Sequence, residues 1–375
     1  MKVLFLTASY PTPESPGAGI FVREHARAAA LHADVAIAHI ARDDDVRRIH
    51  VEDGGDDEFP SVRVRYPAAP LPVSYAANVA AAAIAYRRLG RLGFEPDVIH
   101  AHFFLAGAPA IVLGRLRRKP VVITEQWSVF LPDDPMTLSP LMRRVARFAF
   151  EHADVVMPVS EALRDGIRAT GANANFRIVP NVVDTSRFHP GVEPPHDGGP
   201  HTLIGVGNLY SAKGWEDLLD ALPLVRERHD VRLEIYGDGV LRSALEDQAR
   251  RVGVDGVVTF HGWRPKDEVA ARLRSSELFV MTSRYDSNPC ALIEALATGT
   301  PVVGTAVGGI PEMVTAESGV LAEPGRPASI AAAIDAALER GWDRAQIAEG
   351  AHARYGAERV GADFASIYED VVRSQ

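Results

Sequence analysis

The sequence predicts an α/β protein of two domains, each built on a parallel sheet covered by helices. Short apolar runs alternate with longer segments of helical spacing, and this alternation stops once and then restarts. The length of 375 residues also exceeds what a single core usually organises. A hydrophobic content of 47% with 24% charged residues is typical of a folded globular chain.

Short apolar runs predict strands that are buried on both faces of a sheet. In the first half these runs span residues 3–7, 35–40, 62–66, 98–101, 121–124, 155–159 and 176–179. Helical spacing appears at 20–31, 75–92, 106–116, 140–152 and 161–169, whereas the acid-rich stretch 42–58 shows neither pattern. Strands that alternate with helices connect through right-handed crossovers, so we expect a parallel sheet with helices on both faces.

A break rich in proline and glycine, HPGVEPPHDGGP at 189–200, predicts a linker between a first domain at 1–188 and a second at 201–355. Further strands are expected at 203–206, 232–236, 257–260, 278–281 and 302–304, with helices from Trp215, from Leu241, at 269–274, at 290–297 and after Ser329. The final segment, 356–375, is expected to form a helix that returns to the first domain. Two Rossmann-like domains of this kind bind ligands at the carboxyl ends of their strands, in the cleft between them.

The distribution of charge excludes one class of partner. Residues 1–184 contain 21 basic and 21 acidic side chains, and the rest of the chain contains 19 and 28, so the net charge of -9 lies in the second half. A nucleic-acid-binding protein would need a net basic face, so no nucleic-acid partner is expected. The single cysteine, Cys290, fits a reducing compartment. The N-terminus lacks a signal-peptide pattern and no run of roughly 20 apolar residues occurs, so a cytoplasmic location is expected.

The segment 283–309 carries the most informative chemistry. Ser287 or Asn288 is expected to cap a helix whose first residue is Pro289, and Gly299 is expected to end it. The free N–H groups at the start of such a helix attract an anion. Asp286 and Glu294 flank this helix start, and their carboxylates can accept hydrogen bonds from sugar hydroxyls. The residues alone allow a second interpretation, a capped helix with one buried glutamate and no ligand.

The same segment resembles the signature of family 4 retaining glycosyltransferases of the GT-B type. That signature has two glutamates separated by seven residues and then a Gly-x-Pro-Val-Val turn, and Asp286, Glu294 and the stretch 299–303 (GTPVV) fall on these positions. The resemblance implies that Glu294 binds the nucleotide ribose and that Asp286, with Ser287 and Asn288, contacts the donor sugar. It also implies transfer of a hexose-type sugar from a nucleoside-diphosphate sugar, UDP- or GDP-linked, with retention of configuration.

The resemblance extends over nearly the whole chain. The stretch 205–214 (GVGNLYSAKG) is similar to the family's phosphate loop, which assigns Lys213 and Asn208 to the donor diphosphate. The stretch 17–22 (GAGIFV) is similar to the glycine-rich loop that places Gly17 and Gly19 near the same group. The stretch 260–264 (FHGWR) lies where the family meets the nucleobase, which puts Trp263 and Arg264 beside the nucleotide. The stretches 180–184 and 236–239 resemble the family's interdomain segment and its Gly-x-Gly strand end, and all these stretches occur in the same order as in the family. Lys213 would neutralise the leaving diphosphate.

Several positions depart from the family pattern. Arginine is usual at the position of Asn208, glutamate at that of Asp286, histidine at that of Gln126 and glycine at that of Val182. The loss of the arginine removes a forked phosphate donor. These changes leave open an unusual donor sugar, a slow enzyme, or a degenerate protein that binds nucleotide sugar without transfer.

The other polar motifs support weaker interpretations. His102 and Gln126 are candidates for the acceptor side, although a packed structural histidine explains His102 as well. The acidic runs 43–45 and 133–134 lack ligand spacing, so neither a metal nor another cofactor is expected. An NAD-dependent oxidoreductase is disfavoured because Tyr210 stands where the Gly-x-Gly-x-x-Gly fingerprint needs glycine. A nucleotide-sugar epimerase is disfavoured by the Asp286 and Glu294 signature.

Two basic clusters lie in the first half. One spans 115–119, and the other comprises Arg143, Arg144 and Arg147, next to Phe148 and Phe150. These clusters are either solvated helix faces or a peripheral contact with the inner face of the plasma membrane, where a lipid-linked acceptor would lie. The acceptor hydroxyl would otherwise belong to a saccharide in polysaccharide or glycoconjugate biosynthesis.

Overall fold

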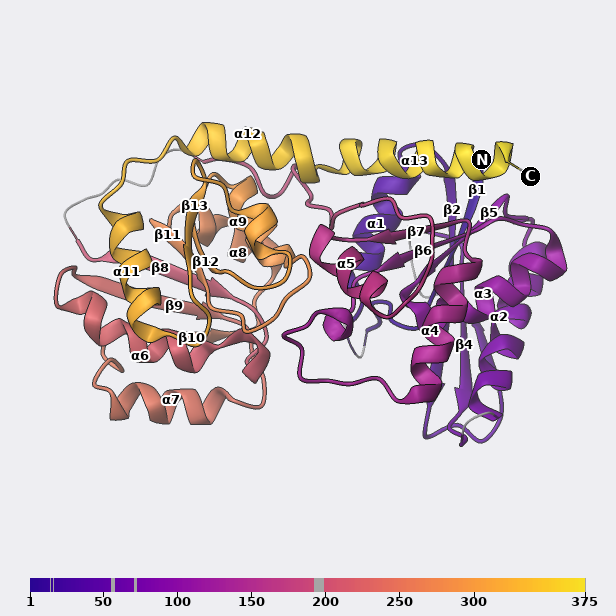
Figure 1. The fold of residues 1–375 in the computed structure, drawn as a ribbon, viewed down its shortest axis with the longest axis horizontal. Coiled ribbons are helices and arrows are strands. Elements are labelled where there is room, and N and C mark those ends of the chain that lie inside the picture. Colours follow the sequence, from indigo (N-terminus) through magenta and orange to yellow (C-terminus); the bar gives the residue numbers. More distant parts are fainter. Residues whose placement is uncertain (14, 16, 55–57, 71–72, 192–198, 375) are drawn as a thin grey trace. The chain divides into compact units, whose positions relative to one another are not determined.

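The computed structural model describes residues 1–13, 15, 17–54, 58–70, 73–191 and 199–374. The chain divides into two compact units. The N-terminal unit comprises Met1–Phe130, Met136–Val182 and Ala357–Gln375, and the C-terminal unit comprises Leu131–Pro135 and Val183–Gly356. Figure 1 shows a sheet with covering helices in each unit.

The N-terminal unit is built on a seven-stranded sheet of order β3-β4-β2-β1-β5-β6-β7. Its strands are β1 (Lys2–Thr7), β2 (Asp34–Asp43), β3 (His50–Asp53), β4 (Ser61–Pro67), β5 (Val98–His102), β6 (Val121–Glu125) and β7 (Val155–Pro158). All neighbours are parallel except β3 and β4, which are antiparallel. The central strands β1 and β5 are almost wholly buried, as expected for a sheet that is covered on both faces.

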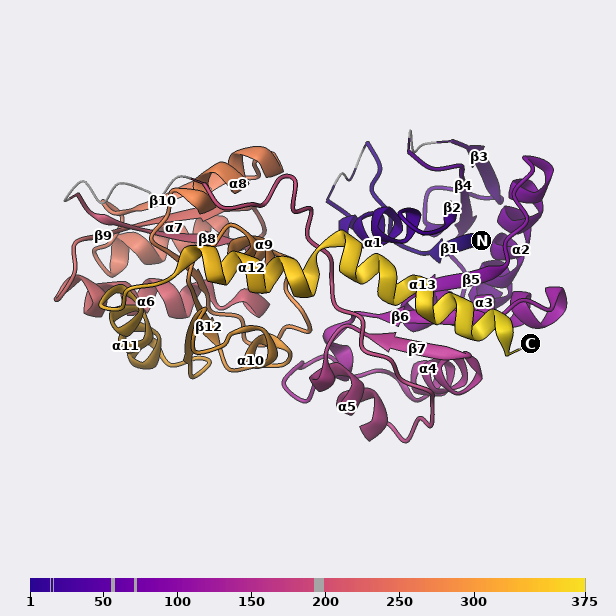
Figure 2. The same ribbon diagram turned by 90° about the horizontal axis from the view of Figure 1, so that it is seen from above.

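Two groups of helices cover this sheet. α1 (Ile20–Ala30) packs with α13 (Ala357–Arg373) on one face, while α2 (Val73–Arg91), α3 (Phe103–Arg117) and α4 (Pro140–His152) form a row on the other (Figures 1 and 2). η1 (Ser128–Phe130) follows β6, and α5 (Glu161–Ala169) follows β7. Phe364 and Tyr368 of α13 are fully buried in one cluster with Val3, Phe5 and Ile37 of the sheet. The expected return of the last helix to the first domain is therefore present within this unit.

The C-terminal unit contains a six-stranded sheet of order β10-β9-β8-β11-β12-β13, and all its pairs are parallel. Its strands are β8 (His201–Val206), β9 (Val231–Tyr236), β10 (Val258–Gly262), β11 (Leu278–Met281), β12 (Val302–Thr305) and β13 (Gly319–Ala322). The helical segments are η2 (Ser211–Lys213), α6 (Trp215–Arg226), α7 (Arg242–Arg251), α8 (Lys266–Arg274), α9 (Cys290–Ala297), α10 (Ile310–Met313), α11 (Pro327–Leu338) and α12 (Arg344–Tyr355). Two buried clusters lie against this sheet, one with α6, α7 and α11 and one with α8, α9 and α12.

The structure departs from the predicted elements in several places. Residues 176–179 form no strand, and only an isolated bridge joins Phe176 to Val156. The acid-rich stretch 42–58 contains β3, because Arg63 and Arg65 of β4 pair with Glu52 across the two strands. The short strand β13 was not predicted. α3 begins at Phe103, three residues before the expected 106, because Glu125 fixes its first turn.

The boundary between the units also differs from the predicted one at 188. It falls between Val182 and Val183, because the Val183 N–H donates to the Tyr355 carbonyl (2.9 Å) and Phe188 is buried in the C-terminal core. The predicted linker at 189–200 lies after this boundary, and its residues 192–198 fall outside the described residues. Residues 131–135 also group with the C-terminal unit.

Candidate active site

The candidate donor residues lie in loops at one edge of the C-terminal sheet. Because β8, β9, β10 and β11 are parallel, the loops that follow them emerge at the same edge. The loop after β8 contains η2, and the loop after β11 leads to α9. The Thr282 hydroxyl donates to the Gly214 carbonyl (2.9 Å), and the Arg284 N–H donates to the Ala212 carbonyl (2.8 Å). These bonds fasten the two loops together.

The fastened loops bring Lys213 to Asp286. The Lys213 ammonium (Nζ) lies 2.5 Å from Asp286 Oδ2, and the two side chains are 26% and 15% exposed. The Asp286 carbonyl accepts a hydrogen bond from the Gly309 N–H (3.0 Å). Gly308 has φ +49°, and a Cβ there would lie 2.0 Å from the same carbonyl oxygen. Only glycine fits at this turn, so the backbone of Asp286 is held at a fixed place beside Lys213.

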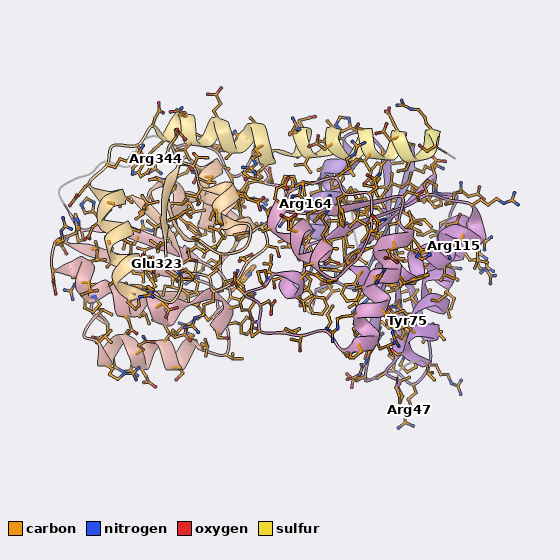
Figure 3. The ribbon with its side chains drawn as sticks, viewed as in Figure 1. Arg47, Tyr75, Arg115, Arg164, Glu323 and Arg344 are labelled. Carbon is orange, nitrogen blue, oxygen red and sulfur yellow. The ribbon has the colours of Figure 1, made fainter. Side chains whose placement is uncertain are left out.

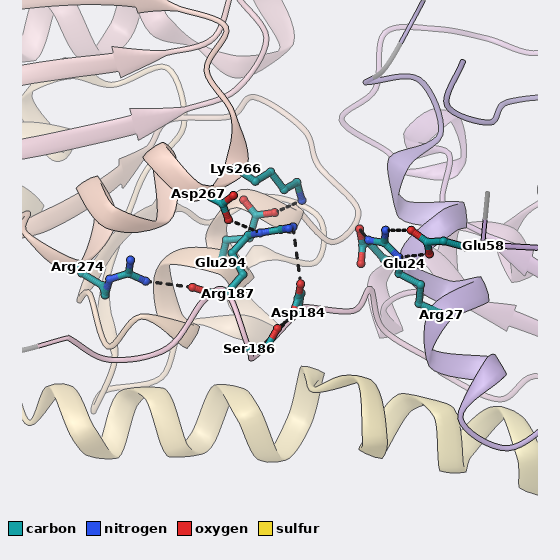
Figure 4. A network of polar contacts seen from close by, with 10 residues as sticks. All are labelled: Glu24, Arg27, Glu58, Asp184, Ser186, Arg187, Lys266, Asp267, Arg274 and Glu294. Atoms are coloured by element: carbon teal, nitrogen blue, oxygen red, sulfur yellow. Dashed lines mark hydrogen bonds and ion pairs between the residues drawn. The ribbon is translucent and has the colours of Figure 1, made fainter. Parts of the chain in front are cut away.

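Glu294 has a lysine partner that was not anticipated. Lys266, the first residue of α8, places its ammonium 2.5 Å from Glu294 Oε1 on the second turn of α9 (Figure 4). The Glu294 side chain is only 9% exposed, so the ammonium offsets the cost of holding a charged carboxylate there. Lys266 also lies over the ring of Phe188, 5.6 Å from its centroid. Arg187 extends this polar region through Asp184 and Asp267.

The rarity of lysine in the sequence could have singled out Lys266. The chain has only four lysines, Lys2, Lys119, Lys213 and Lys266, and all its other basic residues are arginine. Both lysines of the C-terminal unit pair with the two carboxylates of the candidate site. A lysine ammonium is a compact charge on a flexible stem, whereas an arginine guanidinium is held in a fixed fork, so the two residue types are not interchangeable at such a pair.

The remaining predicted donor residues occupy different environments. Asn208 is exposed at the end of β8, where its carbonyl accepts from the Trp215 indole N–H (3.0 Å). Ser287 and Asn288 are buried, and neither caps α9: Pro289 is the N-cap residue, with no side-chain cap. The Asn288 amide instead lies 3.3 Å from the Met313 sulfur. The expected cap fails because both side chains turn inward.

The predicted nucleotide residues after β10 are open to solvent. Trp263 is 64% exposed, and the Arg264 guanidinium lies 3.6 Å from Glu268 on α8. Neither side chain contacts Glu294 in the interactions of the described residues. An exposed indole has free surface on which a base can stack, so the geometry is compatible with the prediction and does not test it.

Gly17 and Gly19 belong to the N-terminal unit, in the loop that leads to α1. Gly19 is the N-cap of α1 with φ +61°, and a Cβ there would lie 2.2 Å from the Ser9 carbonyl oxygen. Gly17 is exposed and has open space around its Cα. The local backbone therefore requires glycine at position 19 but not at 17. That both residues meet the same diphosphate as Lys213 stays a prediction.

His102 lies in a buried stack of three histidines. Its ring is fully buried, 4.6 Å from the ring of His100 and 5.5 Å from that of His25, and neither ring nitrogen has a hydrogen-bond partner among the described residues. Burial lowers the pKa of His102 well below its usual range, and the neighbouring histidines lower it further. The prediction that His102 meets an acceptor hydroxyl is not supported, because the ring has no exposed surface. The packed-histidine interpretation describes it better.

Gln126 follows β6 and is half-buried. Its amide donates to Nδ1 of His25 (3.3 Å), and Nε2 of His25 donates to the Pro180 carbonyl (3.3 Å). Burial lowers the pKa of His25 to about 4, so this histidine is neutral and accepts at Nδ1. The sequence placed Gln126 where the family often has a histidine, and the structure shows a buried histidine in contact with it.

Glu125 is a buried carboxylate that was not singled out from the sequence. Its oxygens accept the backbone N–H groups of Phe104 (2.9 Å), Gln126 (3.0 Å) and Trp127 (3.0 Å). Burial raises the pKa of Glu125 to about 7, although these three bonds act against the rise. Phe103, between His102 and Phe104, has φ +66°, which is strained for a bulky residue. Glu125 thus holds the loop of Gln126 against this strained turn.

No group of three or more histidine, cysteine, aspartate or glutamate side chains in the described part of the chain is arranged to hold a metal ion. No helix within the described ranges combines the length and apolar character needed to cross a membrane. The acidic runs at 43–45 and 133–134 form no such metal cluster.

Comparison with solved structures defines the class. Anabaena Alr3699/HepE, solved in complex with UDP, matches with a TM-score of 0.77 at 20% identity, over 99% of this chain and 100% of that one. The same protein has also been solved in complex with UDP-glucose. Two parallel-sheet α/β units with a C-terminal helix that joins the first unit are the architecture of the GT-B class, and this chain has it.

Comparison of sequences identifies the family. The model "Glycosyltransferase Family 4" matches residues 17–187 and "Glycosyl transferases group 1" matches 192–354. Glycogen synthase of Mycobacterium tuberculosis H37Rv is 31% identical over 288 residues, which cover 74% of this chain and 68% of that protein. The putative teichuronic acid biosynthesis glycosyltransferase TuaC of Bacillus subtilis is 26% identical over 362 residues, 89% and 88% of the two chains. The chain belongs to the family 4 glycosyltransferases of the GT-B type.

Proposed function

We propose that this glycosyltransferase moves a hexose-type sugar from a nucleoside-diphosphate sugar to an acceptor hydroxyl, with retention of anomeric configuration. The observation that carries the proposal is the pairing of Lys213 with Asp286 at the edge of the C-terminal sheet, beside Lys266 and Glu294. The two ammonium groups suit a diphosphate, and the two carboxylates can accept hydrogen bonds from hydroxyls on either side of it. A protein of the same fold, HepE, has been solved with UDP and with UDP-glucose. We therefore favour a UDP-sugar over a GDP-sugar as the donor.

We infer that Lys213 exchanges partners when the donor binds. An incoming diphosphate competes with Asp286 for the Lys213 ammonium, and Asp286 is then free to accept hydrogen bonds from the donor sugar. Glu294 would hold the ribose diol while Lys266 keeps its charge balanced. Lys213 would stabilise the negative charge that grows on the diphosphate as it leaves.

The reaction breaks the bond between the anomeric carbon and the diphosphate oxygen and forms a bond from that carbon to the acceptor oxygen on the same face. The leaving phosphate takes the acceptor proton, so no protein base is assigned. Closure of the site over the donor would exclude water and limit hydrolysis. The names of the relatives, glycogen synthase and a teichuronic acid glycosyltransferase, favour a saccharide or glycoconjugate acceptor.

A panel of UDP, GDP, ADP and TDP sugars tests the donor. Sugars linked to one of the four nucleotides should raise the melting temperature of the wild-type protein. The same ligand should raise the melting temperature of Lys213→Met and of Glu294→Gln by less. Arg251→Met and Asp255→Asn, at exposed positions elsewhere in the unit, are matched controls and should behave as wild type. A product with inverted anomeric configuration, measured by NMR, would contradict the proposed mechanism.

A second function is motivated by the departures at Asn208 and Gln126: a subunit that binds nucleotide sugar without transferring it. Thermal shifts without sugar release or transfer would favour this alternative. Release or transfer that disappears in Lys213→Met would exclude it.

We also propose that the reaction requires no metal. The support is that the Lys213 ammonium can supply positive charge of the kind that a divalent ion provides in other diphosphate sites. Activity should persist after treatment with a chelator and should not rise on addition of Mg²⁺ or Mn²⁺. Loss of turnover that Mg²⁺ restores would contradict this proposal.

A further inference from the structure

The three helices that cover one face of the N-terminal sheet carry an unusual charge. α2 and α4 each contain three arginines and α3 contains two, and the only acidic residue in the three helices is Glu151. The helices of the opposite face, α1 and α13, contain four arginines and five acidic residues. The basic layer therefore belongs to one face of the unit, in a chain whose net charge is -9.

Most of these arginines are not part of a salt-bridged surface. Arg88 pairs with Asp53, and Arg147 pairs with Glu151 (2.7 Å). Arg143 and Arg144 on the exposed side of α4 have no ion-pair partner among the described residues. Unpaired arginines held on rigid helices leave a positive surface available to an anionic partner.

An apolar groove lies within the same layer. It has a volume of about 250 Å³ and an almost wholly apolar surface. Its walls are Tyr75 and Val79 of α2, Ala108 and Val112 of α3, and Val145 and Phe148 of α4. All of these except Ala108 are partly exposed, so the groove opens at the surface of the unit. Figure 3 labels Tyr75 on α2 and Arg115 near the end of α3.

Two of the arginines lie next to the apolar groove. Arg144 borders the groove, and the Arg115 guanidinium lies over the ring of Phe148, 5.7 Å from its centroid. Val73, Leu116 and Leu141 add apolar surface on the same three helices, with exposures of 60%, 74% and 43%. A soluble polyanion would use the arginines but would leave this apolar surface in water. An amphiphile with an anionic head and a hydrocarbon chain uses both.

We propose that the layer formed by α2, α3 and α4 is a docking surface for an anionic lipid bilayer. The arginines contact headgroup phosphates, and the groove accepts part of one hydrocarbon chain. The proposal concerns the N-terminal unit alone and does not depend on the donor chemistry of the C-terminal unit. It favours the second of the two interpretations that the sequence left open for the basic clusters.

Co-sedimentation with vesicles tests the proposal. We expect the full chain to bind vesicles of phosphatidylcholine mixed equally with phosphatidylglycerol at low salt, and not to bind phosphatidylcholine alone. Arg143→Ala combined with Arg144→Ala should weaken binding by roughly tenfold or more, since each basic residue near an anionic surface contributes separately. Arg250→Ala combined with Arg251→Ala removes two neighbouring exposed arginines from α7 and should leave binding unchanged.

The groove has its own test. Val79→Asn places a polar group in its wall, and we expect this variant to bind at low salt but to lose the binding that wild type retains at physiological salt. Each variant should keep its wild-type thermal shift with donor nucleotide, which separates this proposal from the proposed transfer function. Equal salt resistance of Val79→Asn and wild type would overturn the role of the groove.

Hydrogen exchange locates the contact. Anionic vesicles should slow exchange in α2, α3 and α4 and leave α1 and α13 unchanged. Absence of binding at low salt, or protection on α1 and α13 instead, would overturn the proposal. Equal protection of the three helices by inorganic polyphosphate without any bilayer would also overturn it, because the layer would then be a site for soluble polyanions.

Discussion

The two units hold their polar side chains in opposite ways. In the C-terminal unit, Asp286 and Glu294 are each paired with a lysine that is partly in water. In the N-terminal unit, His25, His102 and Glu125 are buried, and burial shifts the pKa of each toward the neutral form. The first arrangement suits a charged ligand that takes over a lysine. The second holds side chains that have no exposed surface, so they act in the packing of the unit and not in contact with a ligand.

α13 packs against the buried histidines: the ring centroid of its Phe364 lies 5.2 Å from that of His25 and 5.3 Å from that of His100. Phe364→Ala should lower the free energy of unfolding of the N-terminal unit by about 3–5 kcal/mol, since the side chain is fully buried. Hydrogen exchange in increasing urea, followed strand by strand, measures the effect. Phe279→Ala is the matched control, because Phe279 is equally buried in the C-terminal core and should destabilise only that unit. Equal loss in both units for Phe364→Ala would contradict this separation.

Lys213→Met tests the charged half of the comparison. Loss of the ammonium that stabilises the leaving diphosphate should reduce kcat by roughly 100- to 1000-fold, while folding is retained. The measurement is initial rate under saturating donor, with Arg251→Met as the control for loss of one positive charge. A rate within a few-fold of wild type would remove Lys213 from the proposed mechanism.

Glu125→Gln tests the buried polar groups of the N-terminal unit through the pH dependence of stability. The folded-state pKa of about 7 lies above the unfolded value of 4.5, so between these values the folded protein holds a proton that the unfolded chain has released. The contribution of Glu125 to the free energy of unfolding therefore falls as pH rises from 4.5 to about 7, by roughly 3 kcal/mol at the 1.36 kcal/mol per pKa unit of linkage. Glutamine cannot ionise, so the melting temperature of the variant relative to wild type should rise across this range. Glu95→Gln, at an exposed position, should show no such trend.

Lys266→Met should have the smallest effect. The Lys266 side chain is 28% exposed, so water partly screens its charge, and nucleotide affinity should fall by roughly two- to fivefold at low salt and by less at high salt. Isothermal titration with the preferred nucleotide measures it, and Lys266→Arg is the charge-conserving control. An affinity that does not change at low salt would show that Glu294 functions without its lysine.

The sequence predicted the architecture because buried parallel strands are continuous apolar runs, as at 121–124 and 302–304. It missed β3 because that edge strand is held by ion pairs of Arg63 and Arg65 with Glu52 and not by apolar burial. It placed Lys213 in the loop after β8 and Asp286 in the loop after β11, because each follows a recognisable apolar strand. It could not place Lys266 against Glu294, because that contact depends on how α8 packs on α9.

The buried polar residues were the least predictable part. The direction of the Ser287 and Asn288 side chains, and hence the missing cap of α9, depends on local backbone angles that their residue types do not encode. The role of Glu125 depends on three N–H groups, one of them 21 residues away in sequence. His102 looked accessible at a strand end, and only the packing of Phe5, His25 and His100 around it shows otherwise.

The assignment of α13 to the N-terminal unit has a consequence for biosynthesis. The core of that unit needs Phe364, Ile367 and Tyr368, which are translated after the whole of the C-terminal unit. The C-terminal unit is complete in sequence at Gly356, so on the ribosome it can finish folding before the unit that was begun first. During synthesis of the whole second half, the face of the first sheet that α13 covers stays open. A stop codon directly after Gly356 would leave the N-terminal unit, which is translated first, without α13, while the C-terminal unit would have all its residues.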